Sequence, residues 1–303
     1  MSADNTKTHT DIKLNGWIDR ILPAAARPYA YLMRLDRPIG TWLLLLPGWW
    51  AVMLAGGGAL GADWGLMALF GMGAVIMRGA GCVINDMWDR DLDRMVERTR
   101  GRPLAAGTVS RKQAAQFTAI LFAAGFLILL QMSTMAIVLG ILTLPLIVTY
   151  PLMKRVTWWP QAFLGITFNF GALIGWAAVT GSVPPAALVL YAAGILWTLG
   201  YDTVYAHQDK DDDALVGIRS TALKFGAHGK IWVAGFYAAA CVMLLAAFVL
   251  AGAGWLSCLL LALPAAHAVW QWRIWRMDDP RSSLAVFKAA RDFGLLVLLA
   301  AML

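Results

Sequence analysis

Long apolar stretches dominate the chain from residue 38 onward. Each run is close to the length of roughly 20 residues that crosses a bilayer as a helix. Nine such runs predict nine spans. The last run carries three charged residues, Lys288, Arg291 and Asp292, so eight spans are the alternative. We therefore expect an all-α polytopic membrane protein. The predicted spans are Pro38–Leu54, Gly65–Ile84, Ala114–Met135, Ala136–Met153, Trp159–Val179, Val183–Thr203, Ile231–Gly252, Gly254–Trp272 and Ser282–Leu303.

The first 37 residues are polar and basic, which predicts a tail followed by one transmembrane domain over residues 38–303. Residues 1–13 are expected to be disordered. Apolar positions from Leu14 to Leu22 then follow helical spacing until Pro23, which predicts a short helix lying on the membrane surface, with a frayed tail as the alternative. No short apolar core precedes a small-residue cleavage site, so the first span is expected to be its own insertion signal.

Lysine and arginine concentrate in alternate loops. The connections near 55–63, 131–134, 180–183 and 251–254 contain neither residue. Because positively charged loops stay in the cytoplasm, we expect a cytoplasmic N-terminus, and a ninth span would place the C-terminus outside. The expected location is the inner membrane of a bacterium. The basic loops are Arg90–Lys112, Lys154 with Arg155, Lys210–Lys230 and Arg273–Arg291.

Composition agrees with a membrane protein and argues against a soluble domain, a nucleic-acid-binding protein and a zinc protein. The chain is 60% hydrophobic and 14% charged, whereas about a quarter of residues are charged in soluble domains. The net charge of +7 does not indicate nucleic-acid binding, because its cations lie in these alternate loops. The three cysteines lack paired spacing and are expected to be core residues, and the four scattered histidines argue against a zinc site.

Two acidic clusters interrupt the apolar pattern. Asn85, Asp89 and Asp93 are spaced by four residues, as are Asp209 and Asp213, so each set shares one helical face. Carboxylates near lipid are costly and are kept mainly for a function. Mg²⁺ takes one or two carboxylates and leaves positions for substrate phosphates. The clusters therefore predict a membrane enzyme that uses a diphosphate.

The first cluster is assigned to one Mg²⁺ and the second to another. Asp86 and Asp202 are further candidates, either as direct ligands or as residues that support the ligands. The remaining acids of the two clusters are interpreted as solvated, Asp91 through pairs with Arg90 and Arg94. These solvated acids are Asp91, Asp211 and Asp212.

The two clusters also indicate an internal repeat. Adding 120 to 89 and 93 gives 209 and 213, and four predicted spans separate the clusters. An even number of spans gives both halves the same orientation, with the halves at about 38–153 and 159–272 and an extra helix at 282–303. We therefore expect both clusters at cytoplasmic helix ends, facing one another across a central cavity.

Four sequence blocks carry a resemblance to a known family. Residues 85–107 read NDMWDRDLDRMVERTRGRPLAAG, which resembles the first signature of the UbiA superfamily of intramembrane aromatic prenyltransferases. Residues 201–226 look like the second aspartate motif of its 4-hydroxybenzoate polyprenyltransferase branch, which serves ubiquinone synthesis. Two shorter blocks at Met33–Trp50 and Tyr150–Gln161 agree, so the resemblance covers at least residues 33–226.

The resemblance implies Mg²⁺-dependent transfer of a polyprenyl chain from its diphosphate to 4-hydroxybenzoate. The implied catalytic residues are Asp89, Asp93, Asp209, Asp213 and Lys154. Tyr150 and Lys154 would bind the diphosphate, with Arg155 beside them and Asp202 as a further substrate-binding candidate. Arg37, with Arg34 as its rival, would bind the acceptor carboxylate. Arg78, inside the second span, is a candidate for substrate binding or for a structural ion pair.

Two alternative functions stay open. One is another member of the superfamily, with haem, homogentisate or a naphthoate as acceptor. The other is a transporter built on the internal repeat, which would place acidic residues near mid-membrane instead of at helix ends. Prenyl chain length and oligomeric state leave no sign in the sequence.

Overall fold

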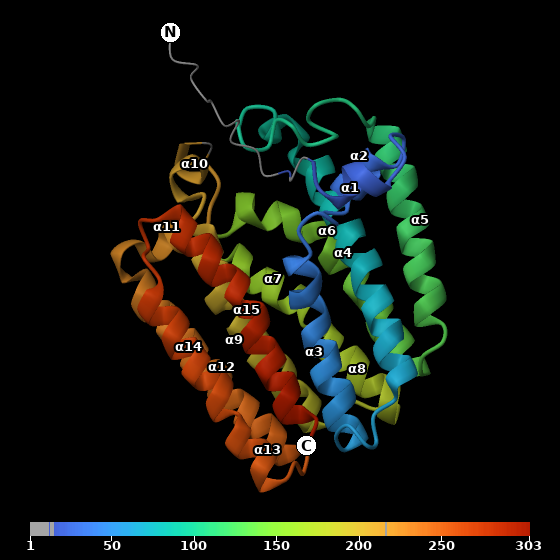
Figure 1. The fold of residues 1–303 in the computed structure, drawn as a ribbon, viewed down its shortest axis with the longest axis vertical. Helices are drawn as coiled ribbons and strands as arrows, with labels where there is room; N and C mark the ends of the chain where they lie inside the picture. The colour runs from blue at the N-terminus through green and yellow to red at the C-terminus, as the bar shows by residue number, and fades with distance from the viewer. Residues whose placement is uncertain (1–11, 13–14, 216) are drawn as a thin grey trace. The chain divides into compact units, whose positions relative to one another are not determined.

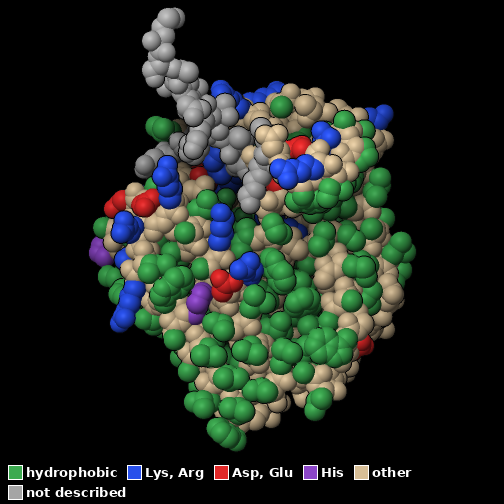
Figure 2. Space-filling view, in the orientation of Figure 1, with side chains coloured by type: hydrophobic (Ala, Val, Ile, Leu, Met, Phe, Trp, Pro, Cys, Tyr) green, Lys and Arg blue, Asp and Glu red, His purple; other side chains and the backbone are tan. Residues whose placement is uncertain are grey.

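The computed structural model describes residues 12, 15–215 and 217–303. The predicted disorder at the N-terminus and the role of Leu14 therefore lie outside the described residues. Every regular element within the described ranges is a helix (Figure 1), which confirms the all-α fold class. Hydrophobic side chains cover much of the surface in Figure 2, as expected for a protein that faces lipid.

Seven helical segments among the described residues are long and apolar enough to cross a membrane. Two of them are interrupted helices: α7 (Pro160–Phe168) continues into α8 (Phe170–Thr180), and α11 (Thr221–Phe225) continues through the 3₁₀ turn η1 (Gly226–His228) into α12 (Gly229–Leu250). The uninterrupted five are α3 (Ile39–Gly56), α4 (Trp64–Asp93), α5 (Arg111–Leu129), α6 (Thr134–Val156) and α9 (Pro185–Ala206).

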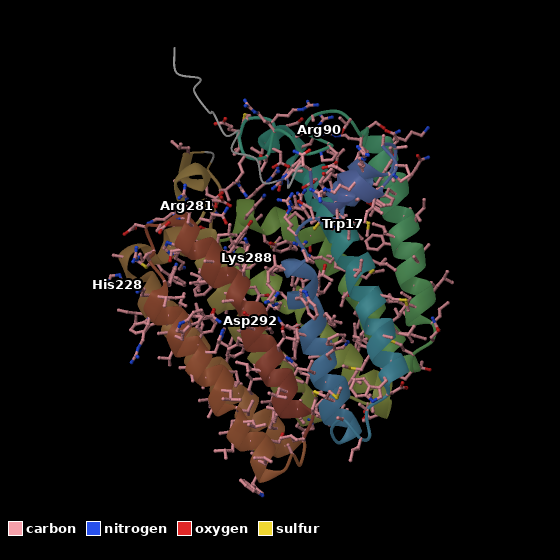
Figure 3. The ribbon with its side chains drawn as sticks, in the orientation of Figure 1. Trp17, Arg90, His228, Arg281, Lys288 and Asp292 are labelled. Atoms are coloured by element: carbon pink, nitrogen blue, oxygen red, sulfur yellow. The ribbon has the colours of Figure 1, made fainter. Side chains whose placement is uncertain are left out.

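The predicted count of nine spans is not confirmed. Helices occupy the last two predicted stretches, but neither is among the seven. The first is divided into α13 (Trp255–Leu260) and α14 (Ala262–Ile274), because Pro264 has no N–H to donate to the carbonyl of Leu260. The second is α15 (Pro280–Ala301), which carries Lys288 and Asp292 along its length (Figure 3).

The chain divides into two compact units. Unit 1 comprises Met1–Pro38 and Ile76–Gly125, and unit 2 comprises Ile39–Val75 and Phe126–Leu303. Helices α4 and α5 each run from one unit into the other. The predicted four-helix repeat divides the chain differently, and that repeat stays a prediction.

Unit 1 includes two short helices, α1 (Trp17–Ile21) and α2 (Arg27–Leu32). The predicted helix before Pro23 is present as α1, which leaves Trp17 (Figure 3) and Ile21 exposed. Its position at a membrane surface stays a prediction. Helix α2 was not predicted, because six residues are too few to show a helical period. The buried core that it shares with α4 and α5 consists of Leu32, Ala80, Val83, Leu104, Val109, Ala114 and Leu121.

Unit 2 is built on an aromatic core. Helix α9 packs against α12 and α7, and α3 packs against α8 and α15. Trp197 of α9 lies between Trp50 and Phe293, with ring centroids 5.1 and 5.7 Å away. The indole N–H of Trp50 donates to the carbonyl of Gly294 at 2.8 Å. Large rings in close contact stabilise this packing and hold the helices in register.

A buried polar contact holds the interruption between α7 and α8. Asn169 is fully buried there, and its Nδ2 donates to the carbonyl of Gly165 at 2.8 Å and to Thr198 Oγ1 at 2.9 Å. A Cβ added at Gly194 would overlap the Asn169 carboxamide. Glycine at this position therefore lets α9 approach the interruption closely.

Candidate active site

The first acidic motif lies on the last turns of α4, within unit 1. The helix continues beyond the predicted apolar span, which ends at Ile84, through Asp93. Asn85, Asp89 and Asp93 consequently share one helical face, as predicted. Asp89 is 2% exposed and Asp93 is 7% exposed. The motif is therefore a rigid and largely dehydrated set of oxygen atoms.

Two arginines neutralise this motif. Arg102 Nη1 lies 3.0 Å from Asp93 Oδ1 and 3.3 Å from Asp86 Oδ1. Arg34 Nη2 donates to the same Asp86 oxygen at 2.6 Å. Buried carboxylates require such partners, because burial without a countercharge costs several kcal/mol. Asp86 thereby joins Arg34 to Arg102, and Arg102 joins Asp86 to Asp93.

Arg34 reaches Asp86 from an unusual backbone conformation. Its φ is 58°, in the left-handed region that favours glycine. The bonds from Arg34 N to Tyr31 O (3.0 Å) and from Leu35 N to Ala30 O (3.1 Å) form a Schellman motif that ends α2. A non-glycine residue at such a position costs of order 1 kcal/mol, and its side chain here forms a buried ion pair. The end of α2 thus aims the Arg34 side chain at Asp86.

The segment after α4 folds back to deliver Arg102. Thr99 Oγ1 donates to the carbonyl of Asp93 at 2.9 Å, and Arg94 Nε donates to the carbonyl of Ala105 at 2.9 Å. The first bond supplies a donor to the carbonyl of the last residue of α4, and the second ties the returning segment to Arg94. Arg102 belongs to the Arg-Pro pair of the first sequence block, yet the sequence reasoning gave it no role in the site. Its contact with Asp93, nine residues earlier, depends on this turn.

The other predicted residues of unit 1 have different surroundings. Arg37 pairs with the neighbouring Asp36 at 3.2 Å. Arg78 Nη1 lies 2.7 Å from Cys82 Sγ, one helical turn away. Asp91 is exposed and pairs with Arg90 at 2.8 Å, so its interpretation as a solvated residue is confirmed.

The second acidic motif, in unit 2, is not on the helix that precedes it. Helix α9 ends at Ala206, and the short helix α10 (Lys210–Leu215) follows. Asp213 N donates to the Asp209 carbonyl at 2.8 Å, so these two residues keep the predicted helical spacing. Asp202 lies on α9, so it does not share a continuous helix with Asp209.

Backbone hydrogen bonds connect this motif to the predicted diphosphate-binding helix. Ile218 N donates to the Asp213 carbonyl at 2.9 Å, and the next residue, Arg219, donates its N–H to the Lys154 carbonyl at 2.8 Å. Unit 2 therefore brings the Lys154 end of α6 and the second acidic motif together. Tyr150 lies one turn earlier on α6 and Arg155 follows Lys154, at the end of the same helix.

Thr221, two residues after Arg219, anchors the segment that follows the second acidic motif to α7 and α9. Gln161 Oε1 at the start of α7 accepts from Thr221 N at 3.0 Å. The hydroxyls of Thr203, on α9, and Thr221 lie 2.7 Å apart. Ser220 Oγ accepts from Leu223 N and begins α11 as its N-cap. Such buried bonds fix the segment in one position.

His207 lies between α9 and α10, buried against Trp275 with ring centroids 5.1 Å apart. Burial lowers the pKa of its imidazole from 6.5 to about 4, and the nearby Lys210 lowers it further while Asp278 opposes the shift. The imidazole is consequently neutral at physiological pH.

The donor atoms of the first motif suit Mg²⁺. In the described part of the chain, no three side chains of His, Cys, Asp and Glu cluster closely enough to hold a metal by themselves. Mg²⁺ does not require such a cage, since it is commonly held by one or two carboxylates together with phosphates and water. Asp89 and Asp93 with the Asn85 amide provide such a set. Asp86 Oδ2 is buried without a hydrogen-bond partner, a further oxygen acceptor at this place.

Comparison with known proteins identifies the family. The model of the UbiA prenyltransferase family matches residues 44–296, most of the chain. This chain belongs to the UbiA prenyltransferase family. The 4-hydroxybenzoate polyprenyltransferase of Drosophila melanogaster, named as mitochondrial, is 48% identical over 286 residues, which are 92% of this chain and 71% of that protein.

Solved UbiA structures share the fold. The apo structure of a UbiA homologue from Aeropyrum pernix K1 matches with a TM-score of 0.69 and 26% identity, over 86% of this chain and 94% of that one. A UbiA homologue from Archaeoglobus fulgidus bound to GPP and Mg²⁺ matches with a TM-score of 0.68 and 17% identity, over 91% and 99%. The chain is thus a multi-pass membrane protein of the UbiA fold.

Proposed function

We propose that the protein transfers a polyprenyl chain from polyprenyl diphosphate to 4-hydroxybenzoate, as a step of ubiquinone biosynthesis. The products are 3-polyprenyl-4-hydroxybenzoate and diphosphate. The observation that carries this proposal is the 48% identity with a 4-hydroxybenzoate polyprenyltransferase over nearly the whole chain. The acceptors haem, homogentisate and naphthoate, and the transporter alternative, have no comparable support.

In the proposed reaction the bond between C1 of the prenyl chain and the diphosphate oxygen breaks. Diphosphate leaves with the electron pair. The electron-rich ring then attacks the allylic cation through the ring carbon that is ortho to its hydroxyl group. The ring carbon then loses its proton and the arene is restored. Stabilisation of negative charge on the leaving group is the main electrostatic requirement of this step.

Asn85, Asp89 and Asp93 are proposed to hold one Mg²⁺, and Asp209 with Asp213 another. Bound Mg²⁺ would supply charge neutralisation for the diphosphate. Tyr150, Lys154 and Arg155 are proposed to contact the diphosphate from the end of α6. The buried pairing of Asp86 with Arg34 and Arg102 supports a role for Asp86 in holding these arginines, in preference to direct metal binding.

Three arginines are proposed as substrate-binding cations, two of them for the acceptor carboxylate. Arg37 and its rival Arg34 are the candidates that the resemblance implies, and Arg78, whose Nη1 lies 2.7 Å from Cys82 Sγ, is a further substrate-binding candidate. Arg37 already has a carboxylate neighbour in Asp36, and Arg34 is engaged by Asp86. Asp202 on α9 stays a proposed substrate contact.

The compartment is also a proposal. The bacterial inner membrane was expected from the sequence, with the N-terminus and active site on the cytoplasmic side. The relative from Drosophila, whose name places it in mitochondria, does not support a bacterial location. Fractionation of the source cells followed by protease protection would establish both the membrane and the orientation.

The direct test is prenylation of 4-hydroxybenzoate by the purified protein in the presence and absence of Mg²⁺. We expect turnover with Mg²⁺ and its loss after chelation, with recovery when Mg²⁺ is restored. Absence of product under all of these conditions, with folded protein, would refute the proposed reaction.

A further inference from the structure

The end of helix α6 needs partners for its last carbonyl groups, because no following turn supplies N–H donors. Arg219 provides two of them. Its backbone N–H donates to the Lys154 carbonyl at 2.8 Å, and its Nη1 donates to the Val156 carbonyl at 2.6 Å. A single residue, 65 positions after Lys154 in the chain, therefore closes the end of the helix that carries Lys154.

The same residue is held from the side of the second acidic motif. Its neighbour Ile218 donates to the Asp213 carbonyl at 2.9 Å. Gly217, with a φ of 73°, makes the turn that lets the chain return toward Asp213. Consecutive residues thus bond to Asp213 on one side and to Lys154 on the other.

The Arg219 guanidinium also lies over an aromatic ring. Its Cζ is 5.6 Å from the centroid of Trp158, just beyond the end of α6. A planar guanidinium can face a ring and donate to a carbonyl at the same time, whereas the ammonium group of lysine has no plane with which to stack. The position therefore favours arginine for its shape as well as for its charge.

We propose that Arg219 is a positioning residue that holds the Lys154 end of α6 in register with the Asp209–Asp213 segment. This inference rests on the proposed function, in which both groups bind the diphosphate. Arg219 itself bonds to backbone carbonyls of this helix end, so it acts on the substrate through Lys154. Misplacement of a binding group by about 1 Å costs up to 100-fold in rate.

The test is a double-mutant cycle between Arg219 and Lys154. Arg219→Ala, Lys154→Ala and the double variant are compared for kcat, for KM of each substrate, and for binding of prenyl diphosphate with Mg²⁺ by calorimetry. We expect Arg219→Ala to weaken diphosphate binding about tenfold, with the KM for 4-hydroxybenzoate unchanged. The double variant should be no worse than Lys154→Ala, because Arg219 acts through Lys154.

Two further variants separate positioning from general stability. Arg219→Lys keeps a donor for the Val156 carbonyl and should recover part of the lost affinity. Arg273→Ala, which removes an exposed arginine at the end of α14, should bind and turn over as the wild type does. The melting temperature of each variant shows whether it is folded.

Additive losses in the double variant would overturn the inference, as would wild-type diphosphate affinity in folded Arg219→Ala. Equal loss of affinity for both substrates would overturn it as well, because it would indicate a general structural role. Calorimetric binding needs no acceptor, so it distinguishes this failure from failure of the proposed function. In the latter case the wild type would bind prenyl diphosphate and leave 4-hydroxybenzoate unmodified.

Discussion

The two acidic motifs have the same residue spacing but different structural supports. In unit 1, Asp89 and Asp93 extend from a continuous helix, and Arg102 and Arg34 neutralise the buried acids around them. In unit 2, Asp209 and Asp213 follow the end of α9, and backbone bonds to neighbouring segments hold them. Buried ion pairs thus support the first motif, and backbone hydrogen bonds support the segment that carries the second.

The largest expected effect is the loss of turnover when an acid of either motif is removed, because both motifs are proposed to hold Mg²⁺. Asp89→Ala and Asp209→Ala should each reduce kcat by about 100-fold or more, because loss of an electrostatic group at a reacting centre has effects of this size. The measurement is steady-state turnover at saturating Mg²⁺. Asp91→Ala, which removes an exposed acid two residues from Asp89, is the control and should retain near-normal turnover. Near-normal turnover of both motif variants would refute the metal assignment.

The charge pairing of unit 1 is tested at Arg102. Arg102→Ala leaves Asp93 without this partner in a buried site, and breaking a buried pair costs about 3 kcal/mol or more. A large drop in melting temperature in detergent micelles is therefore expected. Arg100→Ala removes an exposed arginine that lies 3.6 Å from Glu97 and should change stability by less than about 1 kcal/mol. Equal effects of the two variants would contradict the account of this motif.

Unit 2 should respond to pH through His207. Its pKa is about 4 in the folded protein against 6.5 ordinarily, so the unfolded chain binds the proton more tightly. The stability that this group contributes is complete above about pH 6.5 and is lost as the pH falls toward 4, by roughly 3 kcal/mol. Melting temperatures at pH 7 and pH 4.5 should differ more for the wild type than for His207→Leu. An identical difference in both proteins would show that His207 is not responsible.

The smallest expected effect concerns the hydroxyl pair of unit 2. Thr221→Val removes one partner of the buried Thr203 hydroxyl and should cost about 1 kcal/mol. The double variant Thr203→Val with Thr221→Val should be closer to the wild type, because neither polar group is then left unpaired. Thermal unfolding of the three variants checks this. A double variant that is worse than the sum of its parts would indicate a different packing role.

The sequence predicted the helices well where its signal was apolar periodicity. Each predicted apolar stretch contains a helix, and the common face of Asn85, Asp89 and Asp93 followed from their spacing. The helical continuation of α4 through Asp93 came from the spacing of these polar residues, because the apolar pattern ends at Ile84. The extra helix α2 was missed because its six residues are fewer than the window in which a helical period can be recognised.

The pairing within the site was harder to predict. The contacts from Arg102 to Asp93 and from Arg34 to Asp86 depend on turns, and no periodic pattern reports a turn's three-dimensional path. Arg34 was expected to bind substrate because of its charge near a helix start. Its left-handed backbone, which directs the side chain to Asp86, has no signature in a sequence that lacks glycine there.

The most direct test of the proposed chemistry is the mass spectrum of products formed from an equimolar mixture of 4-hydroxybenzoate, homogentisate and a naphthoate acceptor. The purified protein would receive Mg²⁺ and one polyprenyl diphosphate. We predict one major product, whose mass equals that of 4-hydroxybenzoate plus the prenyl group minus one hydrogen, together with released diphosphate. Prenylation of another acceptor in preference, or consumption of the diphosphate without any prenylated arene, would contradict the account.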